Sequence, residues 1–361
     1  MLTYEIIRDE NRVQALADEW RELYTRAGRS PFSNYDIFMV WWQTIGKTDG
    51  DRTLYLVTGR IDGKLVAVLP LTVVRWKGLR IMQAAGYRAY NYCDMLAEDT
   101  NTAAQLWQAA RKSPHYDFAD IRDVYPHSFC DEALKSFARS RDLSDAFFLE
   151  FKWPTGEDWI KSLSSHARGD YRRCMRHLEK NGSIQYEIYK EGPLPTAIID
   201  SMVKQKIEWA QANKKPGLFY HPNVLAYFHQ SLADAAARNN LFLAWLKSGD
   251  NVIAYNQGFI HDGIIHLPFW TFDPAFARYS PGKVMLFHSM CWAIDNGLKG
   301  LDLRQGGNQI KRTFANEKSQ CAEFTFSGSL RGRLLECAYI AARSLFRLMK
   351  GGAERLAAQE D

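Results

Sequence analysis

The sequence predicts a mixed α/β fold made of two related lobes. Strand-like and helix-like segments alternate along the chain, which is the pattern of a mixed α/β protein. The chain has 361 residues, of which 46% are hydrophobic and 13% aromatic. This is more than a single domain usually holds, so two domains are expected. Two β-hairpins of similar pattern also lie half the chain apart, which favours two domains of one design.

The first half is expected to begin with a strand and two helices. Residues 2–7 have strand character, and residues 11–27 and 35–46 have the apolar spacing of helices. Residues 54–76 then alternate apolar and polar side chains on either side of an Asp-Gly turn at 62–63. This combination predicts a hairpin.

A second hairpin is predicted at residues 241–260. Aligned without a gap, Leu54-Tyr55-Leu56 falls on Leu241-Phe242-Leu243, and Val66-Ala67 falls on Ile253-Ala254. Any two hairpins share apolar alternation, so chance remains one explanation, and duplication of a domain is the other. The equal spacing on both sides of the turn favours duplication.

The junction between the two halves is placed at EFKWPTGE, where Pro, Gly and acidic residues follow a strand-like stretch. The expected domains are therefore 1–150 and 151–330, followed by a tail at 331–361. Residues 331–350 form a basic amphipathic helix, which can lie on a membrane, dock to a partner or pack on its own domain.

Composition argues against several classes of protein. The net charge of +5 suits anionic small molecules and does not require DNA. The six cysteines are far apart and lack a C-x-x-C pair, which argues against a zinc site and a disulfide scaffold and fits a reducing cytoplasm. The N-terminal residues lack the apolar core of a signal peptide, and no run approaches about 18 apolar residues. We expect a cytoplasmic protein, with peripheral contact at the inner membrane face as an alternative.

The stretch RYSPGKV, residues 278–284, predicts an unusual helix start. Ser280 can cap the helix, and Pro281 suits its first position. The amides of Gly282 and Lys283 would point out of the helix start, where N–H groups and the helix dipole bind anions. Arg278 and Lys283 flank these amides. Capping alone is the alternative interpretation of this turn.

Residues 158–181 are expected to form one helix with a basic side. That side carries a basic cluster, which we define as His166, Arg168, Arg172, Arg173 and Arg176. Like charges four residues apart repel on a helix, so the cluster favours an anionic partner. It is either an electropositive wall for a phosphate-bearing or acidic ligand, or a solvated face balanced by Glu179 and Asp170.

Several of these motifs together resemble the GNAT acyltransferase superfamily, and more narrowly the CelD-like acetyltransferases associated with bacterial exopolysaccharide and cellulose synthesis. The resemblance covers roughly residues 5–325 and is related to the Fem-type transferases, which have two GNAT-like lobes. It rests on SSHARGDYRRCMRHLEKNG, on DPAFARYSPGKV through LDLRQGGNQIKRTFA, and in the first half on SPFSNYDIFMVWW, IDGKLVAVLPL and the stretch Tyr90-Asn91-Tyr92-Cys93-Asp94.

The resemblance implies tandem GNAT-like lobes and a donor thioester, acetyl-CoA or another acyl-CoA, without a metal. The donor-binding residues it implies are Arg278, Tyr279, Ser280, Gly282 and Lys283. The common pyrophosphate motif, R/Q-x-x-G-x-G/A, is altered here, because only Gly282 remains of its glycines. An aminoacyl-tRNA donor, as in Fem-type relatives, is therefore a second hypothesis.

The resemblance also assigns a D…G…K pattern to Asp302, Gly306 and Lys311. Acyl transfer to an amine needs a base for the ammonium proton and a donor for the thioester oxyanion. The candidate catalytic residues are Asp302, Arg304, Lys311 and His166. Asp302 either acts as the base or pairs with Arg304 or Lys311, and His266 is a further candidate base. No covalent intermediate is expected, because neither a G-x-S-x-G motif nor an ordered triad is present.

The acceptor is expected in a cleft between the lobes, with the first lobe a degenerate copy that shapes the acceptor side. The candidate substrate-binding residues are Arg168, Arg172, Arg173, Tyr90, Asp94 and Trp270, with Phe272 as a further wall. Three functions follow: an N-acyltransferase acting on an amino sugar or saccharide intermediate, a tRNA-dependent Fem-type transferase, or a non-catalytic subunit of a polysaccharide synthase docked by residues 331–350.

Overall fold

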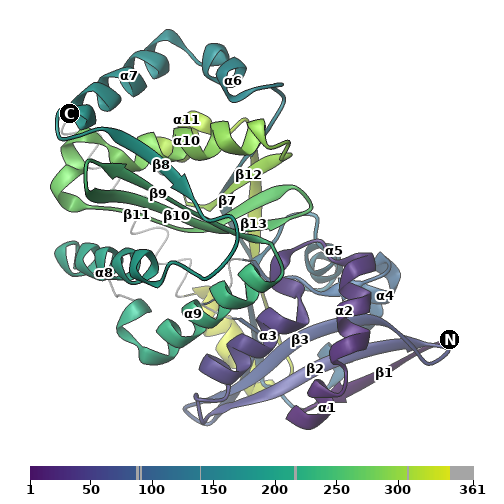
Figure 1. The fold of residues 1–361 in the computed structure, drawn as a ribbon. Coiled ribbons are helices and arrows are strands. Elements are labelled where there is room, and N and C mark those ends of the chain that lie inside the picture. The colour runs from purple at the N-terminus through teal and green to yellow at the C-terminus, as the bar shows by residue number, and fades with distance from the viewer. Residues whose placement is uncertain (87–88, 90–91, 139, 215–217, 307–308, 342–361) are drawn as a thin grey trace. The chain divides into compact units, whose positions relative to one another are not determined.

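The computed structural model describes the chain except residues 87–88, 90–91, 139, 215–217, 307–308 and 342–361 (Figure 1). The chain forms two compact units. Unit 1 comprises residues 1–38, 46–143 and 321–361, and unit 2 comprises residues 39–45 and 144–320.

The sheet of unit 1 has the order β1-β2-β3-β4-β6-β13, and β5 pairs with β3 beside this path. Neighbouring strands are antiparallel except β4 and β6, which are parallel. Asp62 and Gly63 have φ of 49° and 81°, as the tight turn of the β2–β3 hairpin requires, so the hairpin prediction is confirmed. The strands are β1 (Leu2–Ile7), β2 (Arg52–Ile61), β3 (Lys64–Trp76), β4 (Leu79–Ala84), β5 (Leu96–Ala97), β6 (Phe118–Val124) and β13 (Glu317–Ser327).

The helices early in the chain are shorter than predicted. The expected helix at 11–27 is divided into α1 (Glu10–Gln14) and α2 (Ala17–Ala27), and the expected helix at 35–46 is α3 (Tyr35–Trp41) followed by a π-helical turn. Unit 1 also contains α4 (Thr100–Lys112) and α5 (Phe129–Lys135). Its core includes Trp107, on α4, and Phe324, on β13.

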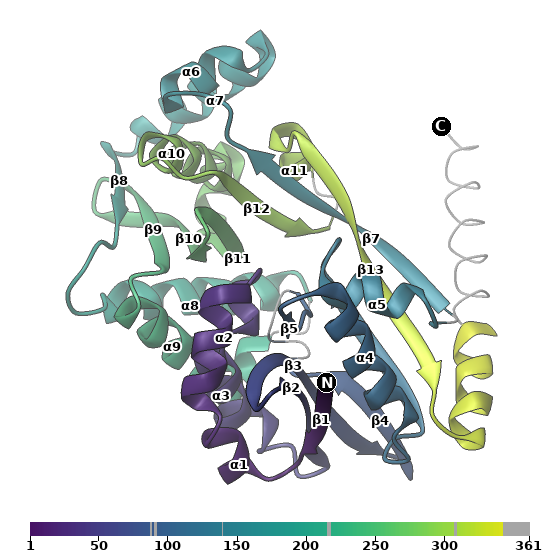
Figure 2. The same cartoon turned by 90° about the vertical axis from the view of Figure 1, so that its right-hand side faces the viewer.

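The basic tail begins with a helix at residues 330–341, which follows β13 and is yellow in Figure 2. This helix packs on unit 1: the rings of Tyr339 and Phe118 have centroids 5.8 Å apart. A Cβ atom at Gly332 would lie 1.5 Å from the Asp117 carbonyl oxygen, so the helix approaches the strand backbone closely. The rest of the predicted helix at 331–350 lies outside the described residues.

The sheet of unit 2 has the order β7-β12-β11-β10-β9-β8. Only β11 and β12 are parallel, and the predicted second hairpin is confirmed as β9–β10. The strands are β7 (Ser140–Glu150), β8 (Ile184–Ile188), β9 (Leu241–Ser248), β10 (Asn251–His261), β11 (Ile264–Phe272) and β12 (Gly300–Gln305).

Helices cover both faces of this sheet. Figure 1 shows α6, α7 and α10 on one face and α8 and α9 on the other. The apolar α10 contributes Phe287 to a core that also contains Trp159, on α6. The helices are α6 (Gly156–Ser162), α7 (Ser165–Glu179), α8 (Thr196–Ala212), α9 (Pro222–Ala237), α10 (Pro281–Asp295) and α11 (Gln309–Phe314).

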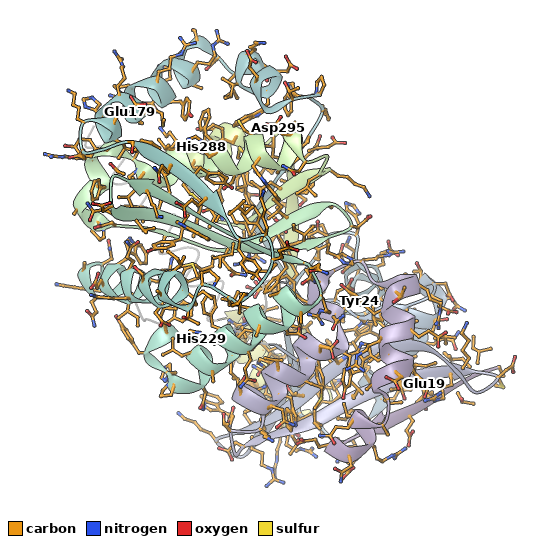
Figure 3. The ribbon with its side chains drawn as sticks, viewed as in Figure 1. Glu19, Tyr24, Glu179, His229, His288 and Asp295 are labelled. Carbon is orange, nitrogen blue, oxygen red and sulfur yellow. The ribbon has the colours of Figure 1, made fainter. Side chains whose placement is uncertain are left out.

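The predicted single helix at 158–181 is broken between α6 and α7. Leu163 has an extended ψ of 155°, and the Ser164 hydroxyl caps α7 by accepting from the Ala167 N–H. Asp295 of α10, labelled in Figure 3, accepts a hydrogen bond of 2.7 Å from the Gly156 N–H at the start of α6. Both short helices therefore dock separately on α10.

The two units repeat one topology. The series β1-β2-β3-β4-β6 and the series β8-β9-β10-β11-β12 both have three antiparallel pairings followed by one parallel pairing. An antiparallel strand then completes each sheet, β13 beside β6 and β7 beside β12. This agreement over whole sheets supports the duplication inferred from the hairpins.

The repeat also shows why the expected boundaries differ from the observed units. A boundary at 150/151 places all of β7 in the first lobe, but residues 146–150 pair with β12 of unit 2. A boundary at 330/331 places β13 in the second lobe, but residues 322–327 pair with β6 of unit 1. The last strand of each sheet therefore comes from the other half of the chain. Strand β7 follows β1–β6 in sequence but pairs with β12, and β13 follows β8–β12 but pairs with β6.

Candidate functional site

The candidate site lies where β11 and β12 separate. Their pairing ends at His266 and Asp302, although β11 continues to Phe272. Pro268 has no N–H to donate to a neighbouring strand. On the other side, β12 has an irregularity between Asp302 and Arg304, and Arg304 has a φ of 66°. A gap therefore opens at the carboxyl ends of two parallel strands, which is where open α/β sheets bind ligands.

Helix α10 begins beside this gap with the predicted unusual start. Ser280 has φ and ψ of 53°, a left-handed conformation, and its side chain makes no capping hydrogen bond. The predicted role of Ser280 as a side-chain cap is therefore wrong. The Lys283 N–H donates to the Ser280 carbonyl oxygen at 3.0 Å, so only one of the two expected amides, that of Gly282, stays available for an anion among the described residues.

The charges around the start of α10 are partly neutralised. The Lys283 ammonium pairs with the Asp170 carboxylate of α7, which also pairs with Arg173. The hydrogen bond from Lys283 is the main reason that the pKa of Asp170 is lowered. Arg278 is exposed and lies 4.5 Å from the ring centre of Tyr279, which stacks on His177. Arg278 is therefore the exposed cation at this helix start.

The basic cluster on α7 divides into structural and exposed members. Arg168 donates to the carbonyl oxygens of Lys161 and Leu163 and so satisfies the end of α6. Arg172 and Arg176 are exposed, and His166 is exposed in the first turn of α7. The cluster is held near the start of α10 by a stack of Tyr171 on Phe287, whose centroids are 4.2 Å apart.

A cavity of about 300 Å³ lies at the gap and reaches the start of α10. A Cβ atom at Gly282 would lie 3.2 Å from Cδ1 of Phe272, so glycine leaves this end of the cavity open. Three predicted residues, Trp270, Phe272 and Gly282, meet here. The lining residues are Lys206, Trp209, Asn256, Trp270, Thr271, Phe272, Gly282 and Ile310.

A buried histidine–aspartate pair lies at the base of the gap. His266 Nδ1 and Asp302 Oδ2 are 3.2 Å apart, and both side chains are at most 5% exposed. Asp302 Oδ1 also accepts from the Arg304 backbone N–H at 2.8 Å. Asp302 therefore pairs with the His266 side chain and with the backbone of Arg304. This pair joins β11 to β12 at their last point of contact.

We expect Asp302→Ala to lower the free energy of unfolding by about 2–3 kcal/mol, because it removes a buried carboxylate that pairs with His266 and accepts from the Arg304 N–H. Urea unfolding at pH 7 measures this change. Asp302→Asn keeps an acceptor for the Arg304 N–H and should lose less. The control is Glu317→Ala, which removes a largely exposed carboxylate and should cost under about 1 kcal/mol. Equal losses for Asp302→Ala and Glu317→Ala would contradict the structural role.

Lys311 is the most strongly perturbed cation of the region. It is 7% exposed, and its Nζ donates to the carbonyl oxygens of Gln305 and Arg304. Burial, helped by the charge of Arg304, lowers the pKa of Lys311 to about 8. Nζ also lies 6.0 Å from the centre of a Trp270 ring, on the wall of the cavity. Lys311 therefore lies beside the cavity and loses its proton at a lower pH than an ordinary lysine does.

Asp94 and His166 are not among the described residues that line the cavity. Asp94 belongs to unit 1, is 8% exposed and accepts from the backbone N–H groups of Met95 and Cys130. Burial raises the pKa of Asp94 to about 6. Its bonds give it a structural role at the start of α5. Tyr90 lies outside the described residues, and His166 is absent from the cavity lining.

Two cavity residues on α8, Lys206 and Trp209, are not predicted from the sequence. Nothing in their spacing distinguishes them from residues of an ordinary amphipathic helix, because only the packing of α8 on β11 brings them to the gap.

The helix of unit 1 at the position equivalent to α10 is α4. There Asp99 caps the first turn by accepting from the Thr102 N–H, so a carboxylate stands where an anion would bind.

Residues 165–312 match the family model described as an acetyltransferase (GNAT) domain. This match covers α7 through α11 and so includes the gap, the start of α10 and the cavity. No curated protein sequence matches the chain significantly.

Solved structures share the fold along nearly the whole chain. FemX is 10% identical with a TM-score of 0.62, over 92% of this chain and 99% of FemX. The C-terminal domain of a putative lysylphosphatidylglycerol synthetase from Agrobacterium fabrum is 11% identical with a TM-score of 0.52, over 84% of this chain and 96% of that one. A tandem GNAT protein from the clavulanic acid biosynthesis pathway is 10% identical with a TM-score of 0.48, over 91% of this chain and 99% of that one. Unit 1 repeats the strand topology of unit 2, and unit 2 contains the residues that match the GNAT domain model, so the fold is a mixed α/β, tandem GNAT-like fold.

In the part of the chain that the structure describes, no helix has the length and apolar character to span a membrane. The same residues contain no group of three or more His, Cys, Asp or Glu side chains arranged to hold a metal ion.

Proposed function

We propose that unit 2 is an N-acyltransferase that takes its acyl group from acetyl-CoA or another acyl-CoA. The observation that carries this proposal is the cavity at the gap between β11 and β12, which reaches the start of α10 at Gly282. A helix start with an available N–H group suits the phosphates of such a donor. The match of residues 165–312 to a GNAT domain model supports the same reaction class.

In this proposal, Gly282 and Arg278 hold the phosphates of the donor, and the gap admits its thioester arm. Lys283 has a structural role in this proposal, because its ion pair with Asp170 holds α7 beside the start of α10. Arg278 is the exposed cation and so contributes the flexible contact. Tyr279 orients this segment through its stacking on His177.

The reaction is a direct transfer. The acceptor nitrogen attacks the acyl carbon, an N–C bond forms, the C–S bond breaks, and the thiolate of CoA takes up a proton as the amine loses one. Most of the rate acceleration comes from holding the acyl donor and the acceptor amine together in one cavity. The protonated Lys311 stabilises negative charge on the thioester oxygen or the departing sulfur. The pair of His266 and Asp302 holds β11 and β12 together where the gap begins.

The acceptor is proposed to be the amine of an amino sugar or saccharide intermediate in bacterial exopolysaccharide or cell-envelope synthesis. The CelD-like sequence motifs support this context, and the aromatic walls formed by Trp209 and Trp270 suit a ring-shaped ligand. Unit 1 is proposed as a degenerate copy without a donor, because Asp99 caps its equivalent helix. The protein is proposed to be cytoplasmic, with residues 331–350 as a docking segment for a membrane surface or synthase complex.

Calorimetric titration with acetyl-CoA, longer acyl-CoAs and free CoA tests the donor assignment. We expect micromolar binding of acetyl-CoA, and weaker binding by the Arg278→Ala variant, because one exposed charge contact is lost. The matched control is Arg75→Ala, which removes an exposed arginine of unit 1 and should leave acetyl-CoA binding unchanged. Failure of every CoA compound to bind would reject the acyl-CoA proposal and favour an aminoacyl-tRNA donor or a non-catalytic role.

A further inference from the structure

The cavity of unit 2 connects the two faces of its sheet. Successive residues of a strand point to opposite faces. Phe272 contacts Gly282 on the face covered by α10, whereas the Phe269 ring centre lies 5.3 Å from Lys206 on the face covered by α8. Because residues of both helices line one cavity together with Trp270, Thr271 and Phe272, the cavity passes the part of β11 that continues beyond its last pairing with β12.

The two ends of the cavity differ in the charged side chains near them. Lys206 is the one charged residue of its described lining, and no carboxylate is among the lining residues. The Lys206 ammonium has three N–H donors, and the one acceptor it reaches among the described residues is the Trp270 carbonyl oxygen at 3.3 Å. Nζ also lies 4.9 Å from the Trp209 ring centre, so aromatic rings hold the cation in place.

A half-buried cation without an ion-pair partner is a costly arrangement. Burial alone lowers the pKa of Lys206, and no neighbouring charge contributes to this shift. Burying a charge is unfavourable unless an opposite charge or several hydrogen bonds compensate. Within the described residues Lys206 forms no salt bridge, in contrast to Lys283 at the other end of the cavity, which pairs with Asp170. An anionic group from a ligand would supply the missing partner.

We propose that Lys206 binds an anionic group, a carboxylate or a phosphate, on the acceptor and thereby selects amines that carry such a group. This inference rests on the proposed acyl-CoA reaction and adds the chemical class of its acceptor. The donor occupies the side of the gap at Gly282, and the acceptor occupies the side at Lys206 and Trp209. The absence of a carboxylate from the described lining also disfavours a second positive charge, so the reacting amine is bound in its neutral form.

The test uses the full chain with acetyl-CoA and three acceptors that share one amino sugar. Glucosamine has no anionic group, glucosamine 6-phosphate carries a phosphate, and muramic acid carries a carboxylate. Release of free CoA thiol is measured for each. We expect kcat/KM to be roughly tenfold or more higher for at least one anionic acceptor than for glucosamine, mainly through KM. The two anionic arms identify which group fits.

Lys206→Met removes the charge and keeps an unbranched side chain of similar length. It should abolish the advantage of the anionic acceptor, so that the kcat/KM values of the anionic acceptor and of glucosamine become similar, while acetyl-CoA still binds. The control is Lys204→Met, two residues earlier on the exposed side of α8, which should change none of these values.

Two results would overturn the acceptor proposal. One is that no anionic acceptor is turned over better than glucosamine, and the other is that Lys206→Met affects all acceptors equally. Both leave the donor assignment intact when acetyl-CoA still binds, whereas failure of the donor assignment itself appears as loss of acetyl-CoA binding by the unmodified protein.

Discussion

Gly282→Trp is expected to abolish binding of acetyl-CoA, with an affinity loss of at least about 100-fold, while the protein remains folded. A Cβ atom at this position already approaches Phe272 to 3.2 Å, so a larger side chain must enter the cavity or displace that ring. Either outcome closes the opening between the start of α10 and the gap. The proposed phosphate contacts and the path of the thioester arm are then blocked together.

A graded series makes this result specific to the cavity. Gly282→Ala adds one methyl group and should weaken binding only moderately, because a shift of a few tenths of an ångström accommodates it. Gly50→Trp is the matched control, since nothing lies within 4 Å of a Cβ atom there. Calorimetry measures binding, and thermal unfolding checks the fold. Unchanged acetyl-CoA binding by folded Gly282→Trp would contradict the donor site.

Replacing Lys311 is expected to have the second large effect. Lys311→Met should lower kcat by roughly 100- to 1000-fold, the usual effect of losing one donor to a developing oxyanion. The KM for acetyl-CoA should change little, because the proposed donor contacts lie at the start of α10. Lys318→Met removes a half-exposed lysine paired with Asp145 and serves as the control, with no expected change in kcat.

The pH profile identifies which form of Lys311 is active. Its pKa is about 8, so the protonated form predominates below pH 8 and is lost as the pH rises through this value. Activity that needs the protonated form must therefore decline above about pH 8. Lys311→Arg keeps the charge at all these pH values, so any activity it retains should lack this decline. A rise in activity through pH 8 that is present in the unmodified protein and absent from Lys311→Arg would instead assign Lys311 as a base and contradict its proposed role.

Local signals made the elements near the site predictable. The hairpin turns were visible because Asp-Gly and Gly-Asp pairs interrupt apolar alternation, and the start of α10 was visible from Ser280-Pro281-Gly282. These signals did not predict the backbone conformation or the hydrogen-bond partners of single residues. Ser280 adopts a left-handed conformation that turns its hydroxyl away from capping, and Lys283 finds both a backbone acceptor and Asp170.

The parts of the site that were missed depend on pairing between distant segments. The partner of Asp302 is His266, 36 residues earlier, because the parallel register of β11 and β12 places them side by side. Lys206 reaches the cavity through the packing of α8 on β11. The expected lobes differ from the observed units at β7 for the same reason, since a strand pattern does not specify which strands will pair with it.

The origin of the closing strands has a consequence for biosynthesis. The ribosome makes residues 1–124, including β1 through β6, early, but the strand that completes their sheet, β13, begins only at Glu317. All of unit 2 is therefore synthesised before the edge of β6 is covered. Until then the nascent chain exposes an unpaired strand edge, a state that invites aggregation. Premature termination before residue 317 should thus leave unit 2 with its strands present and unit 1 without its last strand.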